Sequence, residues 1–125
     1  MSKITIIGLG LIGTSIGMAL RKAKVNVEVV GHDRERGTAN QAQKMGATDR
    51  NEWNLISAVE GAMIVIIATP VKTIEEIMKQ IAPVLQEGCI VTDTGSTKAA
   101  VLQWASDHLP AHVQFVGGHP MAGKE

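Results

Sequence analysis

The stretch KITIIGLGLIG, residues 3–13, constrains the fold more than any other part of the chain. A β-branched apolar run leads directly into six residues with the spacing G-x-G-x-x-G, namely Gly8, Leu9, Gly10, Leu11, Ile12 and Gly13. Glycines at this spacing allow a tight turn, a close approach of the backbone to a ligand, and close packing of the next helix on the strand. We therefore predict a strand, a glycine-rich turn, and a helix whose N-terminus faces a pyrophosphate.

Short apolar runs alternate with stretches of helical spacing along the rest of the chain. The runs lie at residues 3–8, 27–32, 63–68, 89–93 and 113–117, and their continuous Val and Ile content favours parallel strands covered on both faces. Helices are predicted over residues 11–24, 34–45, 71–86 and 97–108, with Gly88 as the stop of the third. Residues 48–61 are ambiguous between a short strand and a helical turn.

This alternation predicts one domain, residues 1–125, of the α/β class. Its expected architecture is a doubly wound parallel sheet, a Rossmann-like dinucleotide-binding domain.

Composition excludes several classes of partner. The chain has 12 basic and 12 acidic residues, so it lacks the electrostatic footprint of a nucleic-acid or membrane-surface protein. No stretch approaches the roughly 18 apolar residues that span a bilayer. The single cysteine, Cys89, has neither a disulfide partner nor a neighbouring cluster of metal ligands. We predict a cytoplasmic protein without a structural metal and with a small-molecule partner.

The acid that the glycine pattern requires about 20 residues further on is Asp33, at the end of the second run. Its carboxylate is expected to hydrogen-bond an adenosine ribose, and it repels a 2′-phosphate by roughly 1 to 4 kcal/mol, which favours NAD. Arg34 and Arg36 follow in GHDRERG and offset that repulsion if they pair with a phosphate, so NADP stays open. Solvated arginines at a helix start are the favoured interpretation.

Two further loops follow predicted strands at the edge where ligands bind in open α/β sheets. In ATPVKT, Pro70 fits the start of a helix and Thr69 faces the cofactor crevice, although an ordinary strand-to-helix turn is an equal interpretation. In TDTGSTK, Ser96 either caps the following helix, presents its hydroxyl to a ligand, or does both.

The last strand leads into GGHP, where Pro120 favours an extended conformation at His119. A histidine, with an unperturbed pKa near 6.5, is suited to accept a proton from a hydroxyl that is being oxidised. A structural hydrogen bond is the alternative for His119, and it is the interpretation that we adopt for His32, His108 and His112.

The motifs GLGLIGTSIGMAL, GHD, ATPV, TDTGSTK and GGHPMAGKE together resemble the N-terminal domain of prephenate and arogenate dehydrogenases. The resemblance implies NAD(P)-dependent oxidative decarboxylation in tyrosine biosynthesis, from prephenate to 4-hydroxyphenylpyruvate or from arogenate to tyrosine. It implies that His119 binds the ring hydroxyl and takes its proton, and that Ser96 hydrogen-bonds near that hydroxyl and the nicotinamide. Lys98 and Glu125 match motif positions whose roles stay open.

Members of this family continue into an all-helical domain that forms a homodimer and supplies basic groups for the substrate carboxylates. We therefore expect residues 1–125 to be a fragment of a longer two-domain enzyme that binds dinucleotide but barely turns over prephenate alone. Two rival interpretations remain. One is a β-hydroxyacid or imine-reducing dehydrogenase, which shares the GLGxxG start. The other is a dinucleotide-sensing regulatory module, which has no use for Ser96 or His119.

Overall fold

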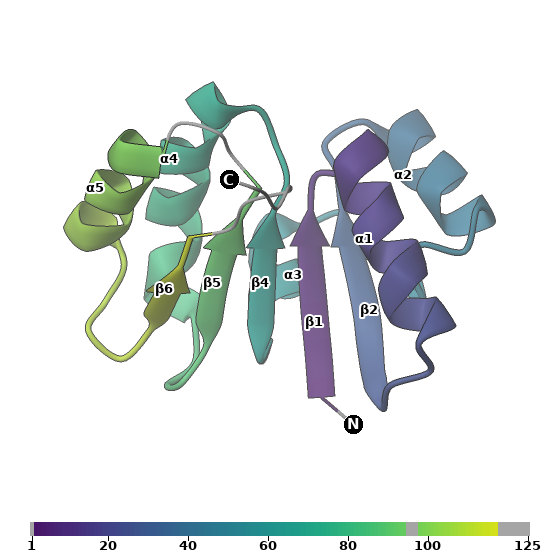
Figure 1. Ribbon diagram of the computed structural model, residues 1–125, viewed down its shortest axis with the longest axis horizontal. Coiled ribbons are helices and arrows are strands. Elements are labelled where there is room, and N and C mark those ends of the chain that lie inside the picture. The colour runs from purple at the N-terminus through teal and green to yellow at the C-terminus, as the bar shows by residue number, and fades with distance from the viewer. Residues whose placement is uncertain (1, 95–97, 118–125) are drawn as a thin grey trace.

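The computed structural model describes residues 2–94 and 98–117, and within them six parallel strands form one sheet (Figure 1). The strand order is β3-β2-β1-β4-β5-β6, the order of a doubly wound sheet. Its two halves, β1 to β3 and β4 to β6, meet at β1 and β4 and extend outwards from there on opposite sides, so the strand order reverses at this point. The strands are β1 (Ser2–Ile7), β2 (Val27–His32), β3 (Arg50–Asn51), β4 (Ile64–Ile67), β5 (Ile90–Asp93) and β6 (Gln114–Val116). The predicted parallel α/β architecture is confirmed.

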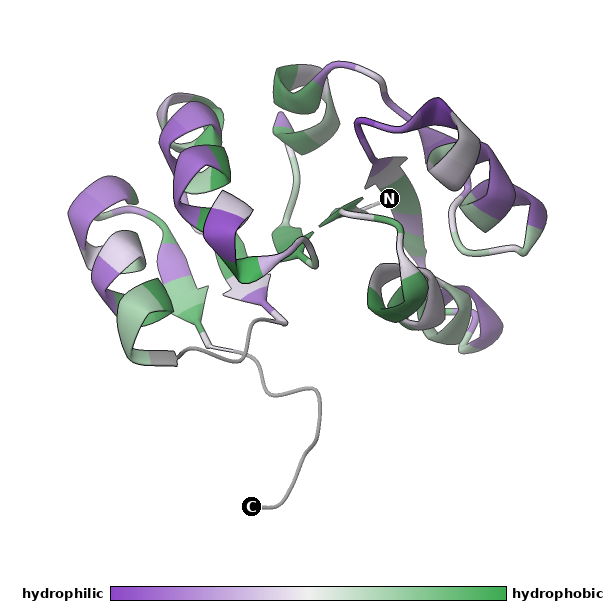
Figure 2. Cartoon of the chain, turned by 90° about the horizontal axis from the view of Figure 1, so that it is seen from above, coloured by the Kyte–Doolittle hydropathy of each residue, from purple (hydrophilic) through white to green (hydrophobic). Residues whose placement is uncertain are grey.

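Helices connect the strands as the apolar spacing predicts. They are α1 (Leu11–Lys22), α2 (Arg36–Lys44), α3 (Leu55–Val59), α4 (Val71–Ile81) and α5 (Lys98–His108), with a 3₁₀ turn, η1 (Ala82–Val84), after α4. Seen from above, they lie on both sides of the sheet and turn apolar surfaces towards it (Figure 2).

Neighbouring residues of β1 enter opposite cores because side chains alternate along a strand. Ile7 packs in a cluster with Ile74 and Met78 of α4 and with Val101 of α5. Ile6 packs in a second cluster that includes residues of α1 and α2. The sheet is therefore covered on both faces, which explains why its strands read as continuous apolar runs.

The structure corrects the predicted end of the third helix. We expected a helix over residues 71–86, but α4 ends at Ile81 and is followed by the 3₁₀ turn. Pro83 explains the difference, because proline lacks an N–H and its ring clashes with the carbonyl four residues earlier. Gly88 is therefore not the helix stop; it has a φ of 84° in the turn before β5.

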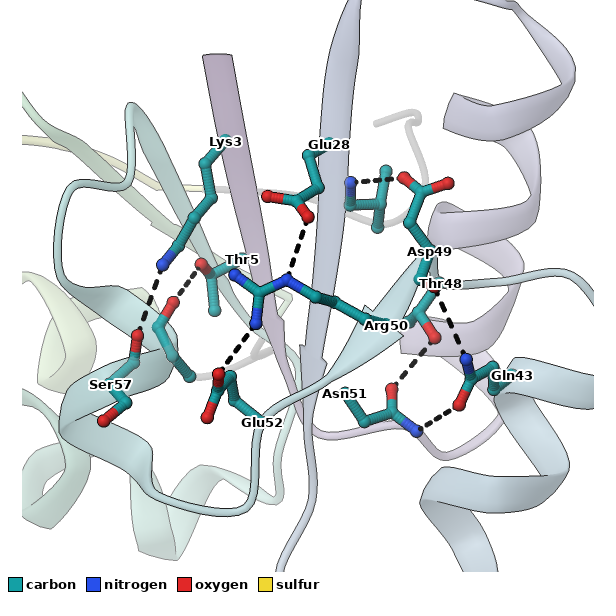
Figure 3. Close-up of polar contacts among 12 residues, drawn as sticks. Lys3, Thr5, Glu28, Gln43, Thr48, Asp49, Arg50, Asn51, Glu52 and Ser57 are labelled. Carbon is teal, nitrogen blue, oxygen red and sulfur yellow. Dashed lines mark hydrogen bonds and ion pairs between the residues drawn. The ribbon is translucent and has the colours of Figure 1, made fainter. Parts of the chain in front are cut away.

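The ambiguous stretch, residues 48–61, contains both a strand and a helix. The strand, β3, has two residues, and side chains hold it to its neighbours (Figure 3). Arg50 Nε lies 2.9 Å from Glu28 Oε2 of β2, and Arg50 Nη1 lies 2.7 Å from Glu52 Oε2. The hydrogen bond to Glu28 raises the pKa of Arg50. Asn51 donates a further hydrogen bond to the Ala39 carbonyl of α2, at 3.0 Å. Side-chain bonds thus supplement the short ladder at this edge.

Candidate dinucleotide-binding site

The turn between β1 and α1 consists of Gly8, Leu9 and Gly10, and the third glycine of the motif, Gly13, lies in the first turn of α1. Gly8 has a φ of 98°, and a Cβ there would lie 2.7 Å from the carbonyl oxygen of Ala68. A Cβ on Gly13 would overlap the carbonyl oxygen of Gly8. Gly8 and Gly13 therefore bring α1 and the β4 loop against the end of β1, as the spacing predicts.

Gly10 differs from these two glycines. Its φ of −75° and ψ of −157° suit any residue, and no atom lies within 4 Å of the position that a Cβ would take. Neither backbone conformation nor packing within the described chain explains a glycine here. The missing side chain leaves an open space directly in front of the N-terminus of α1, where a ligand can approach the backbone.

Unpaired amides line this open space. Gly10 is the N-cap of α1 and provides no side-chain cap, whereas Asn54 caps α3 by accepting a hydrogen bond from the Ser57 amide at 2.9 Å. Within residues 2–94 and 98–117, the N–H groups of Gly10, Leu11 and Ile12 meet no acceptor. Free donors and the positive end of the helix dipole together suit an anion such as a diphosphate.

Leu11 and Ile12, two residues of the glycine-rich motif predicted to bind the cofactor, begin this helix. Leu11 is 85% exposed and Ile12 is 44% exposed, so neither is a core residue. Their exposure leaves two apolar side chains beside the open amides.

The central residue of the turn, Leu9, is held through both of its backbone groups. Its N–H donates to Asp33 Oδ2 at 2.8 Å, and its carbonyl accepts from the hydroxyl of Thr14 at 2.9 Å. The structure thus brings the predicted acid next to the glycine-rich turn. Sequence reasoning missed the role of Thr14, although a polar residue directly after the third glycine, within an otherwise small and apolar stretch, was a usable signal.

Asp33 also accepts a hydrogen bond from the loop that follows β2. Its second oxygen, Oδ1, accepts the Glu35 amide at 2.8 Å, and α2 begins only at Arg36 rather than at residue 34 as predicted. Both carboxylate oxygens therefore hold backbone amides, one from each of the two loops that adjoin the site. Each oxygen keeps a further lone pair that a hydroxyl can use.

The two arginines after Asp33 have different surroundings. The guanidinium of Arg36 lies 4.5 Å from the centroid of the Trp53 ring, a cation–π contact. Arg34 is exposed and belongs to none of the ion pairs found among the described residues. Arg34 is thus the cation beside Asp33 that is left for a phosphate, whereas Arg36 packs on an aromatic ring.

Thr69 and Pro70 form the neighbouring turn, between β4 and α4. The methyl group of Thr69 would lie 2.9 Å from a Cβ on Gly8, so this turn adjoins the glycine-rich one. The Thr69 hydroxyl lies 2.8 Å from the hydroxyl of Thr73, whose single proton also has the Pro70 carbonyl within reach at 2.7 Å. Pro70 is the N-cap of α4. The structure thus places Thr69, Pro70, Asp33 and the glycine-rich turn at one edge of the sheet.

Ser96, His119 and Glu125 lie outside the described residues, as does the side chain of Lys98. The strands that precede Ser96 and His119 are parallel neighbours, since β5 pairs with β4 and β6 pairs with β5. Ser96 and His119 therefore follow strands whose carboxyl ends share an edge with the glycine-rich turn.

Two negative findings concern the described part of the chain. Among residues 2–94 and 98–117, no cluster of three or more His, Cys, Asp or Glu side chains is placed to hold a metal ion. None of the helices in these ranges has the length and apolar character needed to cross a bilayer.

Known proteins are similar to this chain in sequence and in fold. Residues 16–125 match the family model described as prephenate dehydrogenase, nucleotide-binding domain. The prephenate dehydrogenase of Lactococcus lactis is 44% identical over 125 residues, covering 98% of this chain and 35% of that protein. That of Bacillus subtilis is 41% identical over 121 residues, covering 96% of this chain and 33% of that protein.

A solved structure agrees with these relatives. Prephenate dehydrogenase from A. aeolicus, in complex with hydroxyphenyl propionate and NAD+, matches with a TM-score of 0.86 and 30% identity, covering 100% of this chain and 43% of that one. The chain spans about a third of the length of the curated relatives it matches. The chain belongs to the prephenate dehydrogenase family, as its nucleotide-binding domain.

Proposed function

We propose that this chain binds NAD+ in a protein that oxidatively decarboxylates prephenate to 4-hydroxyphenylpyruvate. The observation that carries the proposal is the open space at Gly10, lined by unpaired amides and adjoining the Asp33 carboxylate. This combination fits a dinucleotide, because a diphosphate needs backbone donors and a ribose diol needs an acceptor. The amides follow β1, where the strand order reverses, which is the usual ligand position in such sheets, and Asp33 follows the neighbouring strand β2.

The residues of the chain divide the binding between them. The amides of Gly10, Leu11 and Ile12 donate to the diphosphate, and the α1 dipole adds to this attraction. Asp33 accepts hydrogen bonds from the adenosine ribose through its remaining lone pairs. Thr69 and Pro70 border the proposed binding site on the β4 side. NAD+ supplies the hydride acceptor when it is bound.

Catalysis falls to residues that follow β5 and β6. We assign the proton transfer to His119, which accepts the proton of the ring hydroxyl as hydride leaves the carbon bearing it and carbon dioxide is lost. We assign Ser96 a hydrogen bond near that hydroxyl and the nicotinamide. The support is positional, because β5 and β6 end at the edge that carries the cofactor residues.

For the cofactor we propose NAD rather than NADP. The fixed carboxylate of Asp33 lies where a 2′-phosphate would meet negative charge, a repulsion of roughly 1 to 4 kcal/mol. Of the two arginines that follow Asp33, Arg34 is the one free to offset it, since Arg36 packs on Trp53.

The remaining parts of the proposal concern the whole protein. We propose a two-domain homodimer of which residues 1–125 are the dinucleotide-binding domain, with arogenate as the alternative substrate. We place it in the cytoplasm. The sequence has a single cysteine, Cys89, a usage that is typical of proteins in a reducing compartment.

The test of the catalytic assignment is His119→Asn in the full-length protein. We expect turnover of prephenate to fall by roughly 10² to 10⁴ while NAD+ affinity is retained, because the variant removes a base and no cofactor ligand. Unchanged turnover would contradict the assignment, and NAD+ binding without any turnover in the unmodified protein would favour the regulatory interpretation.

A further inference from the structure

We propose that Asp33 is a positioning residue for the glycine-rich turn, so that it contributes to diphosphate binding as well as to ribose binding. The inference rests on the proposed dinucleotide site. It assigns Asp33 a second role, which it performs through the Leu9 amide and which persists when no ribose hydroxyl is present.

The first step of the argument is the structure of the turn itself. Two of its three residues, Gly8 and Gly10, have no side chain and little conformational preference of their own. Leu9 is the residue at which side chains hold the turn, through Asp33 on its N–H and Thr14 on its carbonyl. Leu9 is also anchored in the apolar core, since it is only 2% exposed and packs with residues of β2 and α2.

The second step is that the carboxylate itself is held in place. Oδ2 accepts the Leu9 amide at 2.8 Å and Oδ1 accepts the Glu35 amide at 2.8 Å. A side chain held at both oxygens links the turn after β1 to the loop after β2. The amides that follow Leu9, at Gly10 and Leu11, keep their direction only if this link persists.

The third step concerns cofactor choice. If Asp33 were only a ribose ligand, its replacement would exchange one cofactor for the other. Because it also holds Leu9, its replacement weakens the binding of every ligand that uses the diphosphate site. Selectivity changes at this position therefore come with a loss of affinity for both NAD+ and NADP+.

The test compares two ligands with two proteins by calorimetry. The ligands are NAD+ and the analogue of NAD+ whose adenosine ribose lacks the 2′ and 3′ hydroxyls, and the proteins are the unmodified chain and Asp33→Ala. We expect the variant to lose roughly 10- to 100-fold in affinity for both ligands, the cost of removing a charged hydrogen-bond acceptor. A loss confined to NAD+ would overturn the inference, whereas failure of the unmodified chain to bind NAD+ would overturn the proposed function.

A second readout needs no ligand. We expect amide hydrogen exchange at Leu9, measured by NMR, to accelerate at least tenfold in Asp33→Ala and less in Asp33→Asn, whose amide oxygen still accepts one N–H. Asp49→Ala is the matched control, because Asp49 Oδ2 accepts the Val29 amide at 2.7 Å and Oδ1 pairs with Arg21 in the last turn of α1, far along the helix from the glycine-rich turn. Unchanged exchange at Leu9 in both Asp33 variants would overturn the positioning role.

Discussion

The β1–α1 turn and the β4–α4 turn occupy equivalent places on neighbouring parallel strands, but only the first is built mainly from glycines. Ile7 and Ile67 pair at the ends of the two strands. After β1 the chain passes through glycines and leaves the amides of α1 uncapped. After β4 it passes through Pro70, and the Thr73 hydroxyl folds back to the Pro70 carbonyl at 2.7 Å and to Thr69.

This difference indicates what the proposed anion site needs in addition to its position in the fold. Both turns lie at the reversal of strand order and neither helix has a side-chain cap, but Thr69 and Pro70 occupy the second turn, whereas two of the three residues of the first are glycines. The second turn still shapes the first, because the carbonyl of Ala68 leaves no room for a Cβ on Gly8. The first turn carries the amides of the proposed anion site, and the second turn packs against Gly8 of the first.

The largest expected effect comes from adding a side chain at the point where α1 packs against the first turn. Gly13→Ala places a Cβ on the Gly8 carbonyl, so α1 must move away from β1. We expect the free energy of unfolding, measured by urea denaturation, to fall by about 3 kcal/mol or more.

Gly37→Ala is the control for this variant. Gly37 lies in α2 with no atom within 4 Å of its Cβ position, so alanine there is expected to stabilise by up to about 1 kcal/mol. Equal stabilities for the two variants would show that α1 has room to move and that the tight contact is not required.

The next effect concerns Arg34, the exposed cation that directly follows Asp33. Arg34→Ala is expected to weaken NADP+ binding about tenfold, the loss of one charge-assisted phosphate contact, and to leave NAD+ binding within about twofold. Calorimetric titration with both cofactors measures this. Arg36→Ala is the matched control, since Arg36 already contacts Trp53. A larger effect of Arg36→Ala on NADP+ would reverse the assignment of the two arginines.

The smallest effect is expected in the second turn. Thr73→Val keeps the shape of the side chain and removes its hydroxyl bonds, so the free energy of unfolding should fall by about 1 kcal/mol. NAD+ affinity should change less than about threefold, because the amides lie in the other turn. Thr38→Val in α2 is the control, since the Thr38 hydroxyl makes no hydrogen bond within the described residues. A loss of NAD+ affinity as large as that expected at the glycine-rich turn would erase the contrast.

The comparison also separates what sequence could predict from what it could not. The glycine spacing placed the first turn correctly because Gly8 and Gly13 answer local steric demands. The bond between the Leu9 amide and Asp33 was not predictable, because it depends on how two loops 24 residues apart face each other. The Arg36 contact with Trp53 has no periodic signal either. Pro83 carried the information that ends α4, but the apolar stripe beyond it concealed that signal.

Roles that came from the family resemblance stand apart from these. Ser96 and His119 were placed by motif rather than by geometry, and their assignments stay predictions. The glycine-rich turn, Asp33 and Thr69 lie together in the structure, and their roles in cofactor binding stay predictions as well.

The most direct test of the central claim is NAD+ binding by Gly10→Val, measured by calorimetry beside the unmodified protein. Among the described residues no atom lies within 4 Å of a Cβ at this position and the backbone is extended, so the variant should fold with only the modest cost of replacing an N-cap glycine. Its side chain fills the space in front of the α1 amides, and we expect NAD+ affinity to fall at least roughly 100-fold, about 2.7 kcal/mol. Unchanged affinity in a fully folded variant would show that the diphosphate binds elsewhere.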